Sequence, residues 1–183
     1  EGYGAEFTGR LALDPAGILS LRGDLGFLIY GWESKPVCFE GVGCRVQADL
    51  QTSNNIFFGG LGPELAFPTS FARPYVNASM GFGYFNTMSS LEDDWGDDNH
   101  FNTENFGDGT FAWAAGWGVE LFVSKGRVPI AINFGSRYHQ NGVMEYLTEG
   151  DIVDHADGSI TLYPNRSEAN FITYHIGMTV NFR

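Results

Sequence analysis

The sequence has no apolar run of the roughly 18 to 20 residues that a membrane-spanning helix needs. Charged residues make up only 17% of the chain, against about a quarter in an average soluble domain. Basic residues are scarce, and the net charge of −12 argues strongly against nucleic acid as a partner, because a phosphate backbone needs a basic face. Glycine (25 residues) and aromatic side chains (15%) are abundant instead, a composition that suits an all-β protein.

The 183 residues fit a single domain, residues 1–183, in which hydrophobic side chains recur with a period of two. Trp113, Trp117 and Leu121 share one face of their segment, for example, while Ala114 and Glu120 occupy the other. Each such segment has one apolar face and one small or polar face, which predicts β-strands. The segments are 3–13, 19–32, 44–66, 74–84, 111–123, 128–139 and 170–183.

Short and long connections alternate between these segments. Tight turns are predicted at 14–17, 67–74 and 124–127, and extended loops at about 34–43, 89–108 and 140–167. This alternation is typical of an up-and-down antiparallel β-barrel that has short turns at one end and long connections at the other.

The strand count depends on residues 44–66. Apolar residues fall on even positions before residues 52–55 and on odd positions after them. A two-residue hairpin there would give eight strands, and a β-bulge in one long strand would give seven. We favour the bulge, which keeps the alternation of connections. A closed antiparallel barrel of about eight strands would then take one more strand, from residues removed before Glu1.

Two observations predict which face of the barrel lies inside. The polar faces carry few charges among small residues, whereas a water-facing exterior would carry many more, and the apolar faces are uninterrupted and contain Trp. A transmembrane barrel has this arrangement, and a soluble ligand-binding barrel has the reverse. The interior charges predicted on this basis are Glu6, Arg10, Arg22, Asp24, Glu120 and Arg137.

The two ends of the barrel also differ in charge. Residues 91–108 and 141–168 hold 13 of the 22 acids and only one basic residue, Arg166. The basic residues of the opposite, short-turn end are Arg73, Lys125, Arg127 and Arg183. The two ends are therefore expected to face different environments.

The ending "HIGMTVNFR", with the phrases "LRGDLGFLIYG" and "GPELAFP…RPYVNASMGFGYF", resembles the small bacterial outer-membrane β-barrel proteins of the OmpA/OmpX-like family. The resemblance implies an outer-membrane location and contact with lipid and lipopolysaccharide. It also implies a C-terminal signal for the barrel-assembly machinery, formed by Ile176, Met178, Val180 and Phe182. Phe182 is penultimate here rather than last, and an ordinary end-strand aromatic is the alternative.

The predicted interior charges could form either a structural network or a conduction path. An eight-stranded barrel is just wide enough for side chains to fill it. Because unpaired buried charge is costly, charges inside it must pair. We therefore favour the structural network.

The acidic stretch "LEDDWGDDNH" raises the question of a metal site. Asp93, Asp94, Asp97 and Asp98 offer the oxygen ligands that Ca²⁺ prefers, but their spacing is not that of an EF-hand loop. A solvated acidic loop without a cofactor is the favoured interpretation, and bound Ca²⁺ is the alternative. The two cysteines, Cys38 and Cys44, are expected to form a disulfide in an oxidising compartment, with free thiols as the alternative.

The sequence contains few groupings of residues that could form an enzyme active site. Ser136 and His139 are three apart on a predicted strand and therefore point to opposite faces, and His175 is expected to be a hydrogen-bonded interior residue. The predicted function is that of a non-catalytic, integral outer-membrane barrel with a structural or interaction role, able to associate laterally with copies of itself. A narrow channel or small-ligand barrel is the alternative, and a lipid A-modifying enzyme is the less favoured one.

Overall fold

The computed structural model describes residues 1–38, 47–67, 69–93, 101–124, 126, 128–146, 151–155 and 160–181. Within these ranges every regular element is a β-strand, as predicted, and no helix is long and apolar enough to cross a membrane. The strands are β1 (Tyr3–Ala12), β2 (Leu19–Cys38), β3 (Gln47–Ala66), β4 (Ala72–Asp93), β5 (Phe101–Ser124), β6 (Ile130–Asn141), β7 (Val143–Tyr146), β8 (Ile152–Asp154), β9 (Ile160–Leu162), β10 (Asn165–Glu168) and β11 (Phe171–Val180).

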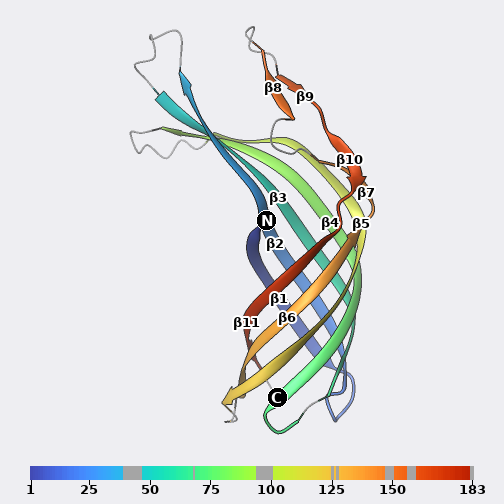
Figure 1. The fold of residues 1–183 in the computed structure, drawn as a ribbon. Coiled ribbons are helices and arrows are strands. Elements are labelled where there is room, and N and C mark those ends of the chain that lie inside the picture. Colours follow the sequence, from blue (N-terminus) through green and yellow to red (C-terminus); the bar gives the residue numbers. More distant parts are fainter. Residues whose placement is uncertain are drawn as a thin grey trace.

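Seven of these strands form one antiparallel sheet in the order β1-β2-β3-β4-β5-β6-β11, which curls into a half-barrel (Figure 1). Each strand of this sheet pairs with the next main-sheet strand along the chain, with β7 to β10 inserted between β6 and β11, so the up-and-down antiparallel prediction is confirmed. The sheet ends in two edges, because β1 pairs with β2 and β11 with β6, and the described strands include no pairing between β1 and β11. The main sheet therefore has seven strands where about eight were expected.

Residues 47–66 form one strand, and the predicted alternative of a hairpin at 52–55 is wrong. β3 pairs with β4 from Ala48 to Leu61 without a register shift. The irregularity lies in β2, between Ile29 and Gly31, opposite Asn55 and Asn54. The change of hydrophobic phase has another cause, since the even-numbered Ile56 and Phe58 are buried apolar residues on the inner face of the sheet.

The strands continue into the segments predicted as loops. β2 reaches Cys38, β4 reaches Asp93 and β5 begins at Phe101. The segment predicted as a loop over 140–167 also contains strands, because β7 pairs with β10 and β8 with β9. These small sheets lie beyond the half-barrel at its long-connection end (Figure 1). Polar sequences that looked like loops thus extend the sheet on this side.

The turn between β1 and β2 is fixed by Asp14. Its carboxylate accepts hydrogen bonds from the backbone N–H of Leu19 (2.6 Å) and of Ala16 (2.9 Å). Gly17 adopts a positive φ of 68°, a conformation that favours glycine. The hydrogen bond from Leu19 is the main reason why the pKa of Asp14 lies below its usual range.

The curled sheet is apolar on its convex side and polar on its concave side. Exposed side chains on the convex face include Phe7 (78%), Met80 (70%) and Tyr174 (82%). On the concave face Glu64 and Glu120 are both fully buried. This distribution is the reverse of a water-soluble barrel, in which apolar side chains point inward. The face predicted to lie inside from sequence alternation is the concave face.

A small apolar cluster closes the concave side toward the long-connection end. Ile56, Phe58, Phe85 and Met144 are buried there, and the ring of Phe171 packs edge-on against Phe58 and Phe85. The inner face is therefore polar toward the short turns and apolar toward the long connections.

Gly81 of β4 lies against the backbone of the neighbouring strand β3. A Cβ atom at this position would meet the carbonyl oxygen of Gly59 and the Cα of Gly60, both backbone atoms of the neighbouring strand. We expect Gly81→Ala to lower the free energy of unfolding by about 1–3 kcal/mol, the usual cost of overpacking. Urea unfolding in detergent measures the effect. Gly177→Ala is the matched control, because a Cβ there has nothing within 4 Å. Equal effects of the two substitutions would contradict the steric argument.

Candidate functional site

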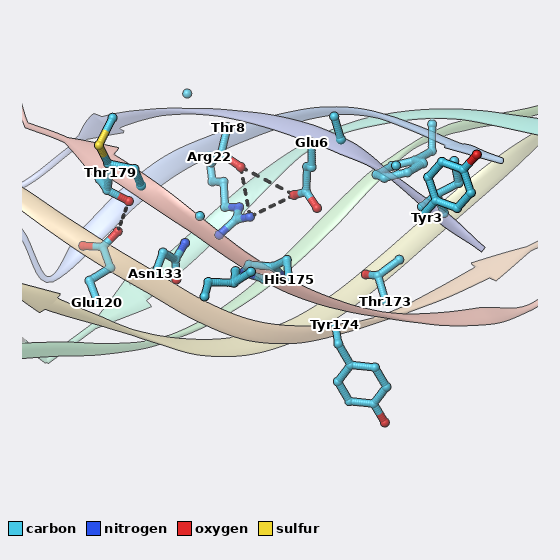
Figure 2. A pocket seen from close by; sticks show the side chains of 18 of the residues that line it. Tyr3, Glu6, Thr8, Arg22, Glu120, Asn133, Thr173, Tyr174, His175 and Thr179 are labelled. Carbon is cyan, nitrogen blue, oxygen red and sulfur yellow. Dashed lines mark hydrogen bonds and ion pairs between the residues drawn. The ribbon is translucent and has the colours of Figure 1, made fainter. Parts of the chain in front are cut away.

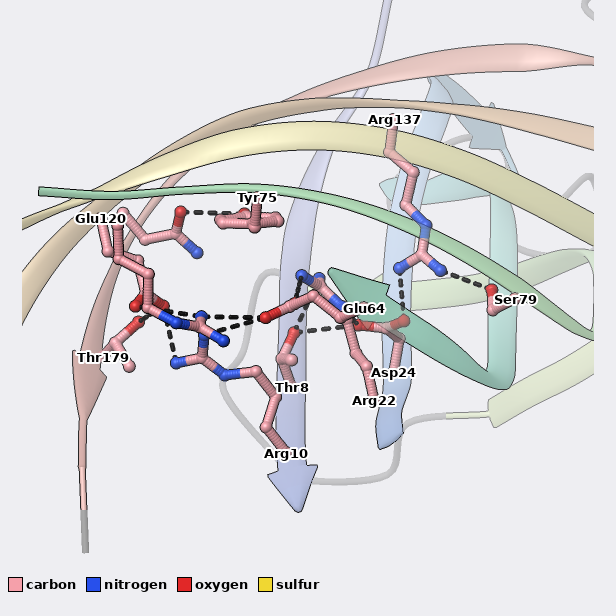
Figure 3. A network of polar contacts seen from close by, with 12 residues as sticks. Thr8, Arg10, Arg22, Asp24, Glu64, Tyr75, Ser79, Glu120, Arg137 and Thr179 are labelled. Atoms are coloured by element: carbon pink, nitrogen blue, oxygen red, sulfur yellow. Dashed lines mark hydrogen bonds and ion pairs between the residues drawn. The ribbon is translucent and has the colours of Figure 1, made fainter. Parts of the chain in front are cut away.

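The most distinctive feature of the molecule is a cluster of eight ionic side chains on the concave face (Figure 3). Four arginines alternate with four carboxylates, drawn from β1 to β6 of the main sheet. Because the alternation of the strands points every second side chain inward, charges far apart in the chain converge there. The members are Glu6 and Arg10 of β1, Arg22 and Asp24 of β2, Glu64 of β3, Arg73 of β4, Glu120 of β5 and Arg137 of β6.

Glu64 lies at the centre of one half of the cluster. Its Oε1 accepts from Arg73 Nη1 at 2.9 Å and from Arg10 Nη1 at 3.3 Å, and its Oε2 lies 3.1 Å from Arg22 Nη1. Arg10 reaches on to Glu120, with Nη2 2.6 Å from Oε1. The same Glu120 oxygen accepts a hydrogen bond of 3.1 Å from the hydroxyl of Thr179 on β11. Both edge strands of the sheet therefore contact one buried carboxylate.

Asp24 lies at the centre of the other half. Its Oδ1 is 2.7 Å from Nε of Arg22 and its Oδ2 is paired with Nη1 of Arg137. Glu6 contacts the same two arginines at 3.2 and 3.4 Å. Arg137 also donates to the hydroxyl of Ser79. Each arginine is thus shared between carboxylates rather than held by one.

The charges of the cluster balance. The eight members carry four positive and four negative charges, and each is involved in at least one of the ion pairs described above. Their side chains are largely withdrawn from solvent, with exposures from 0% for Glu64 to 15% for Arg10. A buried ion needs a partner to offset its lost hydration. The pairing therefore offsets the cost of burying these eight charges. It also leaves no uncompensated charge within the cluster to attract a permeating ion.

Polar side chains around the cluster are joined to each other. The Tyr75 hydroxyl donates to Oδ1 of Asn133 at 2.9 Å and lies 3.3 Å from Nε2 of His175. The guanidinium of Arg22 sits 5.5 Å over the Tyr75 ring. The structure places His175 on the concave face with a hydrogen-bond partner, as expected from its position in β11.

Six cluster members were predicted from the sequence, and the structure brings all six together. Glu64 and Arg73 were missed. Glu64 lies on the even-numbered face of β3, opposite Leu61 and Leu65, and that alternation could have identified it. Arg73 was assigned to a turn, although β4 begins at Ala72 and turns its odd-numbered side chains inward.

The other predicted residues are separate from this cluster. Ser136 lies on the convex side and His139 is buried on the concave side, so they do not form a nucleophile and base pair. Ile176, Met178 and Val180 project from the convex face of β11. Phe182, Cys44, Asp94, Asp97 and Asp98 lie outside the described residues, as do the side chains of Cys38 and Asp93. Among the side chains that the structure describes, no group of three or more metal-binding residues is found.

A cleft of about 1250 Å³ lies beside the cluster, between the two edges of the main sheet (Figure 2). Residues 1–6 and 8–10 line it from the β1 side, and residues 172–181 from the β11 side. Glu6, Arg22 and Glu120 of the cluster form part of its wall. The cleft thus opens the polar interior along one seam of the half-barrel.

Comparison with known proteins finds no family model, no curated protein and no solved structure that matches this chain. Functional inference therefore relies on the sheet, its two faces and the ion-pair cluster.

Proposed function

We propose that this protein is an integral β-barrel protein of the bacterial outer membrane, with a structural or interaction role and no catalytic activity. The observation that carries the proposal is the reversed placement of apolar and polar side chains on the curled sheet. Met80, Trp117 and Ile176 expose between 63% and 73% of their surface on the convex side, while paired charges fill the concave side. Lipid is the solvent in which such a surface is stable.

The ion-pair cluster supports a structural role over a channel. Arg22, Glu64 and Glu120 are almost completely buried and contact partners on other strands. Opening a water path along the concave face would break several of these pairs at once, because each arginine bridges more than one carboxylate. Away from the cleft between β1 and β11, paired side chains fill the concave face, which fits a membrane anchor better than a pore.

The convex face also supports lateral association. Trp113 packs edge-on against Tyr138, and both rings remain exposed, at 43% and 38%. Phe82 and Phe111 are paired across β4 and β5 and are exposed as well. Aromatic surface of this kind can pack against lipid or against a neighbouring copy. We propose contacts of both kinds, with the acidic connections presented beyond the membrane.

The proposal predicts heat-modifiable behaviour on a gel. The protein is expected to require detergent for extraction from membranes and to migrate differently on SDS gels with and without boiling, because a membrane barrel stays folded in unheated SDS. Folding into vesicles, followed by circular dichroism and gel mobility, gives an independent measurement.

The same preparations test the alternatives. A folded, monomeric protein that stays soluble without detergent would contradict membrane insertion. Single-channel conductance in a planar bilayer would favour the narrow channel, and hydrolysis or acyl transfer on lipid A would favour an enzyme.

A further inference from the structure

The cleft between β1 and β11 changes in character along its length. Toward the short turns its wall contains Arg10 and Glu120 of the ion-pair cluster. Toward the long connections it contains Leu28 and Phe58, and Phe58 belongs to the buried apolar cluster. The register of the sheet fixes this order, because Leu28 pairs with Gly4, which lies on the long-connection side of Arg10 in β1. The cleft is therefore polar at one end and apolar at the other.

Two polar side chains in the middle of the cleft have hydrogen-bonding capacity that no described neighbour uses. Nδ1 of His175 is buried without a partner among the described residues, while Nε2 of the same ring lies 3.3 Å from the Tyr75 hydroxyl. Asn133 accepts from Tyr75 through Oδ1, and its amide nitrogen has no hydrogen bond to the described part of the chain. Figure 2 shows both side chains between Glu120 and Thr173 along the cleft. They offer a donor and a ring nitrogen to a ligand.

The backbone of the two edge strands adds further donors and acceptors. β1 and β11 do not pair with each other in the described part of the chain, and both line the cleft. Hydroxyl groups suit such a lining, because each hydroxyl both donates and accepts. A charged group does not suit it, since the four arginines and four carboxylates of the cluster already balance and an added charge would have no partner. The lining therefore favours a neutral ligand that carries hydroxyls.

Gly177 leaves open space on the inner side of β11. It lies between His175 and Thr179, which both contact the concave face, and a Cβ placed on it would touch nothing within 4 Å. The whole cleft has a volume of about 1250 Å³. Small-molecule pockets usually measure about 300–1,000 Å³, so a ligand of ordinary size fits with room for water.

We propose that this cleft binds a neutral single-chain amphiphile with a hydroxyl-bearing head group, of the monoacylglycerol type. The head group lies against Asn133 and His175, beside Gly177. The hydrocarbon chain extends along Leu28 and Phe58 toward the apolar cluster, where it is withdrawn from water. The ligand enters sideways between β1 and β11, so the ion-pair cluster stays intact. Binding of this kind is additional to the proposed membrane role and does not depend on it.

The test uses residues 1–183 folded in detergent, with native mass spectrometry to count the ligands bound to each chain. Monolauroylglycerol is the probe. Methyl laurate has the same chain without hydroxyls, and glycerol has the hydroxyls without the chain. We expect saturable binding of one monolauroylglycerol per chain, and binding weaker by about tenfold or more for the other two, the effect of losing one hydrogen bond or more. Equal binding of methyl laurate would overturn the proposed head-group site.

Gly177→Leu tests the position of the ligand. The leucine side chain would fill the open space beside β11 without meeting a neighbour at its Cβ, and we expect monolauroylglycerol to bind about tenfold more weakly or not at all. Gly126→Leu is the matched control, because Gly126 lies in the turn after β5, away from the cleft. Equal binding to both variants would place the amphiphile on the convex face and overturn the proposal.

His175→Phe tests recognition of the head group by a change that keeps an aromatic ring. Tyr75 retains its hydrogen bond to Asn133 in this variant, and circular dichroism checks that the sheet is folded. We expect monolauroylglycerol to bind about tenfold more weakly and methyl laurate to bind as in the parent protein. Unchanged binding of monolauroylglycerol, or an equal loss of both ligands, would show that His175 does not contact the hydroxyls and would overturn the proposal.

Discussion

Glu64→Gln is expected to lower the free energy of unfolding by about 3–5 kcal/mol, the usual cost of removing one partner from a buried ion pair. Glu64 is fully buried and contacts Arg10, Arg22 and Arg73. Gln keeps the shape of the side chain but removes its charge. Three guanidinium groups would then share a neutral amide, and the cluster would carry one uncompensated positive charge. Urea unfolding in detergent, followed by tryptophan fluorescence, measures the change.

Glu168→Gln is the matched control for this substitution. Glu168 lies in β10, is exposed, and accepts one hydrogen bond from Asn170. A surface substitution of this kind typically changes stability by less than about 0.5 kcal/mol. Similar effects at Glu64 and Glu168 would show that the cluster is hydrated and contributes little to the fold. A pronounced loss at Glu64 alone would identify the cluster as the polar core of the half-barrel.

Met80→Arg is expected to impair folding into vesicles, with a cost of about 2–4 kcal/mol for an arginine facing the middle of a bilayer. Met80 is 70% exposed on the convex face, where it pairs with Leu61 on one side and Trp113 on the other. A charged side chain at this position would lie in hydrocarbon if the proposal is correct. The yield of folded protein in vesicles and its urea midpoint report the effect.

Val143→Arg serves as the control for lipid exposure. Val143 is also an exposed apolar residue, at 58%, but it lies in β7, beyond the end of the half-barrel. Near the membrane surface the cost of an arginine falls to about 0–1 kcal/mol. If both variants fold as well as the parent protein, the convex face is bathed in water and the membrane proposal fails.

Much of the fold could be predicted from the sequence because alternation is a local property. The faces assigned to residues 74–84, 111–123 and 128–139 agree with the burial observed in β4, β5 and β6. Strand ends were harder to place. Residues such as Ser89 and Thr103, which pair across β4 and β5, have the polar character of loops although the backbone continues the ladder.

The candidate site could be predicted only in part. Inward charges on clearly alternating strands were found, whereas Glu64 was hidden by the apparent phase change in residues 44–66. That change came from a switch in what the concave face contains, from Glu64 at one end to Ile56 and Phe58 toward the other. A single sequence cannot separate such a switch from a bulge, because both move apolar residues from one phase to the other. The partners in each ion pair depend on the register and curvature of the sheet. They therefore could not be predicted from a local sequence pattern.

The order of charges along the chain has a consequence for how the sheet can be assembled. The cluster residues of the β1–β2 hairpin, Glu6, Arg10, Arg22 and Asp24, sum to zero. Glu64 and Arg73 cancel within β3–β4, and Glu120 and Arg137 cancel within β5–β6. A chain that enters the membrane one hairpin at a time would thus carry no net cluster charge at any step. If the proposed membrane location is correct, the cluster charges of each hairpin would cancel before the cluster as a whole has formed.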